Sequence, residues 1–201
     1  MSNKFIDTAI SYLGTIEGDS KHHEIVDIYN TISPLPRGYS ATYNDSWCMI
    51  FVSAIAKLCE ISNTEFPYEC SCQKAYNNAT DLGLTTDTIR TGNLIFYDWN
   101  NNDTLDHVGI ITCITDDILT VIEGNKSDNV AYRQISKNSS YIKGYVTVPI
   151  ISTDGTITDD EIIAIAYDVI AGKYGNGETR KNLLGDLYET VQTKVNEILN
   201  S

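Results

Sequence analysis

The sequence of 201 residues lacks any long apolar run, because polar or charged residues interrupt each hydrophobic stretch before the ~18 residues that a membrane helix needs. The first residues, MSNKF, also lack the apolar core of a secretory signal peptide. We therefore expect synthesis in the cytoplasm and no membrane partner. Any action outside the cell would then need a separate release step.

Positive charge is scarce, since the chain has 14 Lys and Arg residues but 27 Asp and Glu residues, which gives a net charge of −13. Binding to a phosphate backbone needs a basic surface, so nucleic acid is excluded as the expected partner. An anionic cell wall would not attract this surface over long range either. Affinity for a wall would have to come from a specific pocket.

The five cysteines are an odd number and show no framework of disulfide spacings, which favours reduced thiols. Cys70 and Cys72 are separated by one residue rather than by the two of a zinc knuckle, and no second pair complements them. His22 and His23 are adjacent and would diverge on a helix. We expect no structural zinc site.

Hydrophobic spacing divides the chain into a helical part, a strand-rich part and a second helical part. This order indicates an α+β fold with a small antiparallel sheet, followed by a small three-helix bundle. The expected domains are 1–150 and 159–201, joined by a polar linker at 151–158. We expect helices at 5–13, 21–32, 48–59 and 72–82, and strands at 94–97, 108–114, 119–122 and 141–148.

Cys48 lies in the first turn of the helix predicted for 48–59, directly after three residues that often cap helices, Asn44, Asp45 and Ser46. Free backbone N–H groups and the helix dipole lower the pKa of a thiol at this position and favour the nucleophilic thiolate. The alternative is a core cysteine that only packs.

A histidine and a carboxylate are expected near each other at one end of a β-hairpin. A turn near 115–118 would pair the strand that begins at His107 with a strand ending near Glu123 and Asn125. Cys48, His107 and Glu123 or Asn125 can then act as nucleophile, general base and orienting group. Taken singly, His107 could be an ordinary surface or core histidine, and the residues after the strand could be turn formers.

Four motifs in order, DSWCMIFVS (45–53), GNLIFYD (92–98), DHVGII (106–111) and VIEGN (121–125), closely resemble the CHAP family of papain-like peptidoglycan hydrolases. The resemblance covers residues 3–150 and implies that Cys48 is the nucleophile and His107 the base, with Glu123 and Asn125 supporting His107. The backbone N–H of Cys48 is one expected oxyanion donor, and Tyr43 is the candidate for a second. The family pattern often has Asp where this chain has Asn93.

The loop 98–106 is rich in oxygen ligands at the spacing of a calcium loop, but it lacks the glycine and the final glutamate of that motif. Some CHAP domains bind calcium, so the resemblance makes this loop a candidate calcium site. A solvated loop without a metal is the alternative, and we expect no cofactor to be required. The candidate ligands are Asp98, Asn100, Asn102 and Asp106.

The segment from Glu161 to Leu199 resembles the three-helix cell-wall-binding repeat of certain phage lysozymes. That resemblance implies binding to the sugar–peptide unit of peptidoglycan. The best candidates for ligand contact are Gly175, Asn176, Gly177 and Arg180, although Arg180 could equally be a capping or solvated residue. A single repeat should bind weakly, so avidity would need a homo-oligomer.

Together these features predict a phage or prophage endolysin, an antimicrobial enzyme that reaches peptidoglycan after release from the host cytoplasm, with help from a holin. The expected reaction is that of an N-acetylmuramoyl-L-alanine amidase. The alternatives are an endopeptidase that cuts the stem peptide or cross-bridge, a non-catalytic wall-binding protein and an interbacterial toxin.

Overall fold

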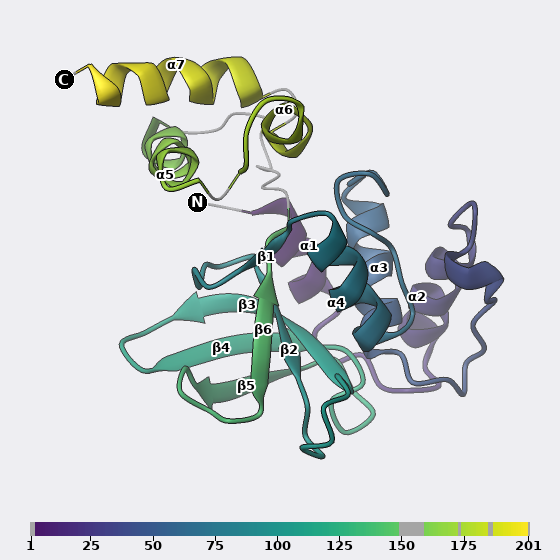
Figure 1. Cartoon of the computed structure of the whole chain (residues 1–201). Coiled ribbons are helices and arrows are strands. Elements are labelled where there is room, and N and C mark those ends of the chain that lie inside the picture. The colour runs from purple at the N-terminus through teal and green to yellow at the C-terminus, as the bar shows by residue number, and fades with distance from the viewer. Residues whose placement is uncertain (1–2, 149–158, 173, 185–186, 201) are drawn as a thin grey trace. The chain divides into compact units, whose positions relative to one another are not determined.

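The structure is a computed structural model that describes residues 3–148, 159–172, 174–184 and 187–200. The chain divides into two compact units, one within residues 2–150 and the other within residues 151–201 (Figure 1). The linker predicted at 151–158 lies outside the described residues. None of the described helices combines the length and the apolar character that crossing a bilayer requires.

Helix α3 (Cys48–Leu58) forms the centre of the first unit, because every side chain from Cys48 to Ala56 is buried. A helix that is buried all round needs other elements on all sides, and α1, α2, α4 and the sheet contact it. The four helices predicted for this part of the chain are confirmed, with slightly different ends. The remaining helices are α1 (Lys4–Ser11), α2 (Ser20–Asn30), the short 3₁₀ helix η1 (Pro36–Gly38) and α4 (Cys72–Asp81).

A six-stranded antiparallel sheet follows the helices, with the strand order β1-β6-β2-β3-β4-β5. The succession of helices and then an antiparallel sheet confirms the predicted α+β class. The strands are β1 (Thr85–Thr86), β2 (Leu94–Tyr97), β3 (His107–Ile114), β4 (Ile118–Glu123), β5 (Ala131–Ser136) and β6 (Ile142–Val146).

The edge strand β5 was not predicted from the sequence. Its side chains alternate only between partly buried and exposed, so the residues AYRQIS carry a weak hydrophobic signal. Its partner β4 supplies the backbone hydrogen bonds in full register, from Ile118 opposite Ser136 to Glu123 opposite Ala131. β5 matters for the site because it carries Arg133.

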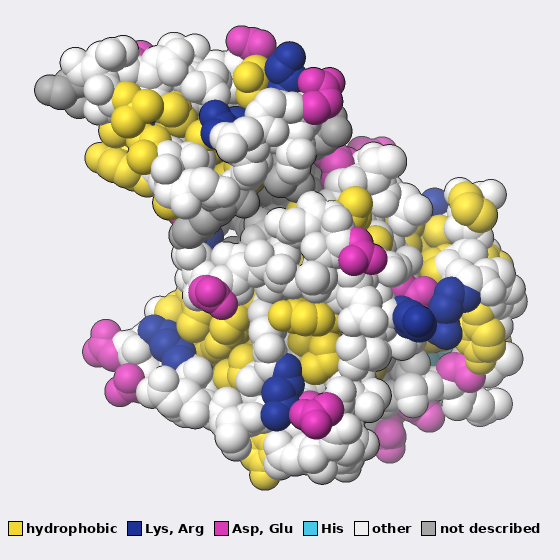
Figure 2. Space-filling model, viewed as in Figure 1, with side chains coloured by type: hydrophobic (Ala, Val, Ile, Leu, Met, Phe, Trp, Pro, Cys, Tyr) yellow, Lys and Arg dark blue, Asp and Glu magenta, His cyan; other side chains and the backbone are white. Residues whose placement is uncertain are grey.

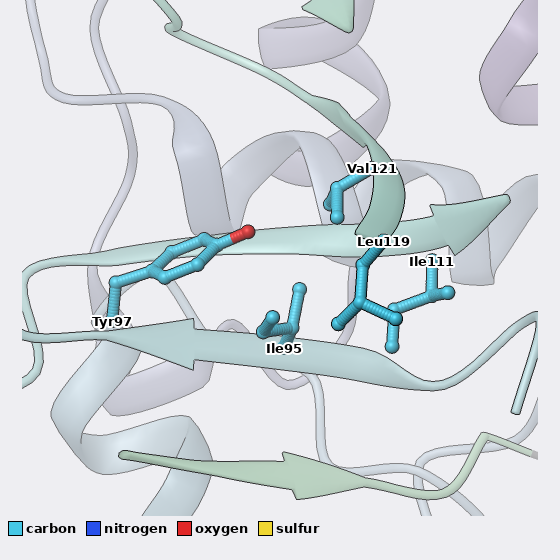
Figure 3. Packing of buried hydrophobic residues seen from close by; sticks show 5 residues of the cluster. All are labelled: Ile95, Tyr97, Ile111, Leu119 and Val121. Carbon is cyan, nitrogen blue, oxygen red and sulfur yellow. The ribbon is translucent and has the colours of Figure 1, made fainter. Parts of the chain in front are cut away.

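A cluster of buried side chains fills one face of the sheet. Figure 3 shows Ile95 and Tyr97 of β2 extending toward the same region as Ile111 of β3 and Leu119 and Val121 of β4. Val121 lies opposite Ile111 in the β3–β4 hairpin, and the register shifts just beyond this pair. The cluster therefore fixes the pairing of the hairpin that carries His107 and Glu123.

The second unit contains α5 (Asp159–Ile170), α6 (Glu178–Leu184) and α7 (Tyr188–Leu199). Both α5 and α6 contact α7. The apolar side chains at helical spacing form its core, and the buried ones are Ile162, Ile165, Ala166, Val169, Leu184, Val191 and Val195. The predicted C-terminal helices are therefore present.

Figure 2 shows how charged side chains are distributed over one face of the molecule. On the face shown in Figure 2, Lys and Arg side chains lie singly or in small groups among acidic and neutral ones, without a continuous basic area. This distribution fits the net charge of −13. It gives the visible face little of the cationic character that phosphate backbones require.

Candidate active site

Cys48 is the first residue of α3, as expected, but the predicted helix cap is wrong in detail. The N-cap is Trp47, which makes no side-chain capping bond. Asp45 instead closes the preceding turn, where its carboxylate accepts from the backbone N–H of Thr42 at 2.6 Å and from the Tyr39 hydroxyl at 2.9 Å. The N–H groups at the start of α3 are therefore left for the Cys48 thiolate.

His107 and Glu123 lie at the open end of the β3–β4 hairpin, where β3 begins and β4 ends. Two glycines make this arrangement possible. A Cβ on Gly109 would lie 2.7 Å from Cγ of Glu123, and a Cβ on Gly124 would lie 2.6 Å from Cβ of Phe51 in α3. The first glycine leaves room for the Glu123 side chain, and the second lets the end of β4 press against the helix that carries Cys48.

Glu123 is held by two cationic groups. Its Oε2 lies 3.1 Å from Nε2 of His107, and Nε of Arg133 donates to Oε1 at 2.7 Å and to Oε2 at 2.9 Å. The side chain is fully buried. Burial by itself would raise the pKa of Glu123, but the hydrogen bonds and charges of His107 and Arg133 hold that pKa below its ordinary value.

Cys48 and His107 stabilise each other's charged forms, a thiolate and an imidazolium. The pKa of Cys48 is lowered to about 5 by its hydrogen bond with Cys72, by His107 and by the N–H of Met49, against the effect of burial. Burial lowers the pKa of His107, but Cys48 and Glu123 outweigh it and raise that pKa to about 9. Because Nε2 of His107 faces Glu123, Nδ1 is the nitrogen available to Cys48.

The structure thus brings together three of the predicted catalytic residues, Cys48, His107 and Glu123. Asn125 adopts a left-handed backbone conformation with φ 56° and lines a cavity beside His107, while Glu123 makes the contact with the ring. This cavity has a volume of about 270 Å³. Its other lining residues are Trp99, Lys126, Ser127 and Arg133.

Two site residues were missed from the sequence. The first is Cys72, whose sulfur lies 3.6 Å from the Cys48 sulfur. Cys72 is the first residue of α4, just as Cys48 is the first residue of α3. The second is Arg133, whose guanidinium carbon lies 4.5 Å from the centroid of the Trp99 ring while it also binds Glu123. The sequence predicted that each of these two helices begins at a cysteine, but the close approach of the two sulfurs depends on how α3 and α4 pack.

Tyr43 is engaged with residues of α2. Its hydroxyl donates to Oδ1 of Asp27 at 2.9 Å, and its ring stacks on His23 with centroids 3.9 Å apart. An oxyanion role for this hydroxyl would require it to leave Asp27. That role stays a prediction.

The predicted calcium ligands already have partners within the chain. Asp98 is buried, accepts from the backbone N–H of Asn102 and Asp103, and lies 3.8 Å from Nζ of Lys143. Asp106 accepts from the backbone N–H of Trp99 and from Nδ2 of Asn100 at 2.8 Å. Within the described part of the chain, His, Cys, Asp and Glu side chains form no group of three suited to a metal ion.

Arg180 organises the turn that was predicted to contact the wall. Its guanidinium donates to the carbonyl of Gly175, to Oδ1 of Asn176 at 3.1 Å and to Oε1 of Gln192 at 3.0 Å. Gly175 and Gly177 both have positive φ, of 60° and 57°. Arg180 therefore joins the turn to α7, and direct contact of these residues with a ligand stays a prediction.

Comparison with protein families finds two matches. Residues 38–125 match the CHAP domain, and residues 164–199 match the CW_7 repeat. A comparison with curated proteins finds no match. Cys48, His107 and Glu123 thus lie in the first matched segment and the turn around Arg180 in the second, while Arg133 follows the end of the first.

Proposed function

We propose that this peptidoglycan hydrolase, which joins a CHAP domain to a CW_7 cell-wall-binding repeat, is an N-acetylmuramoyl-L-alanine amidase with Cys48 as its nucleophile. The observation that carries the proposal is the series Cys48, His107, Glu123 and Arg133, in which Cys48 and Glu123 are buried and His107 and Arg133 are partly buried. A thiolate at a helix start, an imidazolium beside it and a carboxylate that orients the ring are the groups that acyl transfer needs. We further propose that the protein is a phage or prophage endolysin.

In the proposed reaction, the Cys48 sulfur attacks the carbonyl carbon of the lactyl group of N-acetylmuramic acid. Protonated His107 donates its proton to the alanine nitrogen, so the amide C–N bond breaks and the stem peptide leaves as an amine. Water then attacks the thioester, and His107 accepts one of its protons. Free Cys48 and a muramic acid carboxylate result.

The cavity beside His107 supports a substrate that carries negative charge. Lys126 and Arg133 line it, although the net charge of the whole chain is −13 and Arg133 also pairs with Glu123. The stem peptide of peptidoglycan carries carboxylates, which pair well with cations at a partly buried site. The CW_7 repeat places the action of the enzyme at the cell wall.

An endopeptidase would use the same cysteine, histidine and glutamate on a different amide. Mass spectrometry of fragments released from purified peptidoglycan separates the two reactions. We expect glycan strands without peptides together with intact stem peptides. Cut stem peptides or cut cross-bridges would overturn the amidase assignment and favour the endopeptidase.

A non-catalytic wall-binding protein is the alternative from another class. The Cys48→Ala variant should clear no wall suspension yet still sediment with walls, because its second unit is unchanged. Cys113→Ser is the matched control, since Cys113 is exposed on β3 and should leave clearing intact. Residual clearing by Cys48→Ala would contradict the role of this thiol.

A targeting role for the second unit can be tested by ending the chain after Pro149. The shortened protein should keep its rate on small soluble peptidoglycan fragments but lose efficiency on whole cells. Equal activity of the two forms on cells would argue against targeting.

A further inference from the structure

We propose that Cys48 and Cys72 form a reversible oxidation site, at which a hydroperoxide converts the two thiols into a disulfide and switches the nucleophile off. The two sulfurs are 3.6 Å apart, and all five cysteines of the chain are free thiols. A disulfide bond is about 2.0 Å long, so the sulfurs must approach by only about 1.5 Å. Side-chain rotation at the two helix starts can supply a movement of this size.

The surroundings give the two cysteines different parts in this chemistry. Cys48 is paired with His107 and with the N–H of Met49, which favour its thiolate. Cys72 keeps its proton beside that thiolate, since the pKa of Cys72 is raised by its hydrogen bond with Cys48 and by burial. The reactive sulfur and a second, protonated sulfur therefore face each other.

The reaction proceeds in two balanced steps. The Cys48 thiolate attacks one oxygen of hydrogen peroxide, the O–O bond breaks, and a sulfenic acid and hydroxide result. The Cys72 sulfur then attacks the sulfenic sulfur, and the hydroxyl group leaves with the Cys72 proton as water. The thiolate and the thiol lose two electrons in total, and the peroxide is reduced to one hydroxide ion and one molecule of water.

The geometry favours Cys72 over the other cysteines as the resolving partner. Cys70 is its near neighbour in sequence, but its sulfur accepts from Nη2 of Arg37 at 2.8 Å. Cys59 is buried at the end of α3 and contacts Thr8, while Cys113 is exposed on β3. Of these four cysteines, Cys72 is the one whose sulfur lies within hydrogen-bonding distance of the Cys48 sulfur.

The test treats the full-length protein with hydrogen peroxide, blocks the remaining thiols with iodoacetamide and maps the peptides by mass spectrometry. We expect a cross-linked peptide pair containing Cys48 and Cys72, a mass loss of about 2 Da and two fewer alkylated cysteines. Dithiothreitol should restore both thiols. An irreversibly oxidised Cys48 beside an alkylated Cys72 would overturn the proposal, and so would a disulfide from Cys48 to another cysteine.

A variant separates this site from general oxidation of a reactive thiol. In Cys72→Ser, peroxide should carry Cys48 on to the sulfinic acid, so dithiothreitol should not recover its alkylation. Cys113→Ser should behave as the wild-type protein. Equal recovery in Cys72→Ser and wild type would refute the role of Cys72. The peptide map of the wild-type protein decides the question if the variant does not fold, and none of these measurements requires peptidoglycan hydrolysis.

Discussion

Glu123→Gln should narrow the pH range over which Cys48 and His107 hold opposite charges. In the wild-type protein this range extends from the Cys48 pKa of about 5 to the His107 pKa of about 9. The substitution keeps the shape of the side chain but removes the negative charge that lies 3.1 Å from Nε2 of His107. It also leaves the guanidinium of Arg133 without its counter-charge.

The expected change in the pKa of His107 follows from the chemistry of buried ion pairs. An opposite charge within hydrogen-bond distance changes a pKa by about 1–3 units, which corresponds to about 1.4–4 kcal/mol. The pKa of His107 should therefore fall to roughly 6–8 in Glu123→Gln. The pKa of Cys48 should rise, because the imidazolium that stabilises its thiolate is populated less.

The pH dependence of Cys48 alkylation by iodoacetamide measures these pKa changes without a substrate. The basic limb of the pH profile of the hydrolysis rate measures them with peptidoglycan as the substrate. Glu69→Gln is the matched control, because Glu69 is also buried and its carboxylate is bonded to an arginine, Arg37. The other bonds of this carboxylate are to the N–H groups of Cys70 and Ser71. Circular dichroism of both variants tests whether they fold. An unchanged basic limb in folded Glu123→Gln would refute the argument that Glu123 sets the charge of His107.

Three further predictions concern the surrounding structure. Gly109→Ala should lower the unfolding free energy by about 1–3 kcal/mol in denaturant titrations, because its Cβ would lie 2.4 Å from Val121 and 2.7 Å from Glu123. Arg180→Ala should increase hydrogen exchange in α6 and α7 of the full chain, since its bonds to Gly175 and Gln192 disappear; unchanged exchange would argue against its structural role. EDTA should leave the hydrolysis rate unchanged, because Lys143 and backbone N–H groups already neutralise Asp98, and a calcium-dependent recovery would contradict this.

The sequence was most informative where hydrophobic spacing is strong. Apolar residues at helical spacing marked α3, and short β-branched runs marked β3 and β4. The hairpin turn then allowed the proximity of His107 and Glu123 to be predicted, since antiparallel pairing follows from the position of the turn. The observed contact, in which Nε2 of His107 lies 3.1 Å from Oε2 of Glu123, depends only on the pairing of the two strands of this hairpin.

The parts that could not be predicted depend on packing between distant segments. Arg133 comes from an edge strand with few apolar residues, so neither the strand nor its contact with Glu123 had a clear signal. The approach of Cys72 to Cys48 depends on the angle between two helices that start 24 residues apart. Asp45 resembled a helix cap because side-chain acceptors of that kind serve turns and caps equally well.

The contact between Gly124 and Phe51 has a mechanical consequence. The thiol belongs to the helical layer and the imidazole to the sheet, so the spacing of the two layers sets the reach of one group to the other. The backbone of Gly124 packs against the Phe51 side chain, which lies one turn along the helix from Cys48. This contact sets the distance between the helical layer and the sheet. A side chain at position 124 should therefore push the layers apart and lower the activity, even though both reacting groups remain in place.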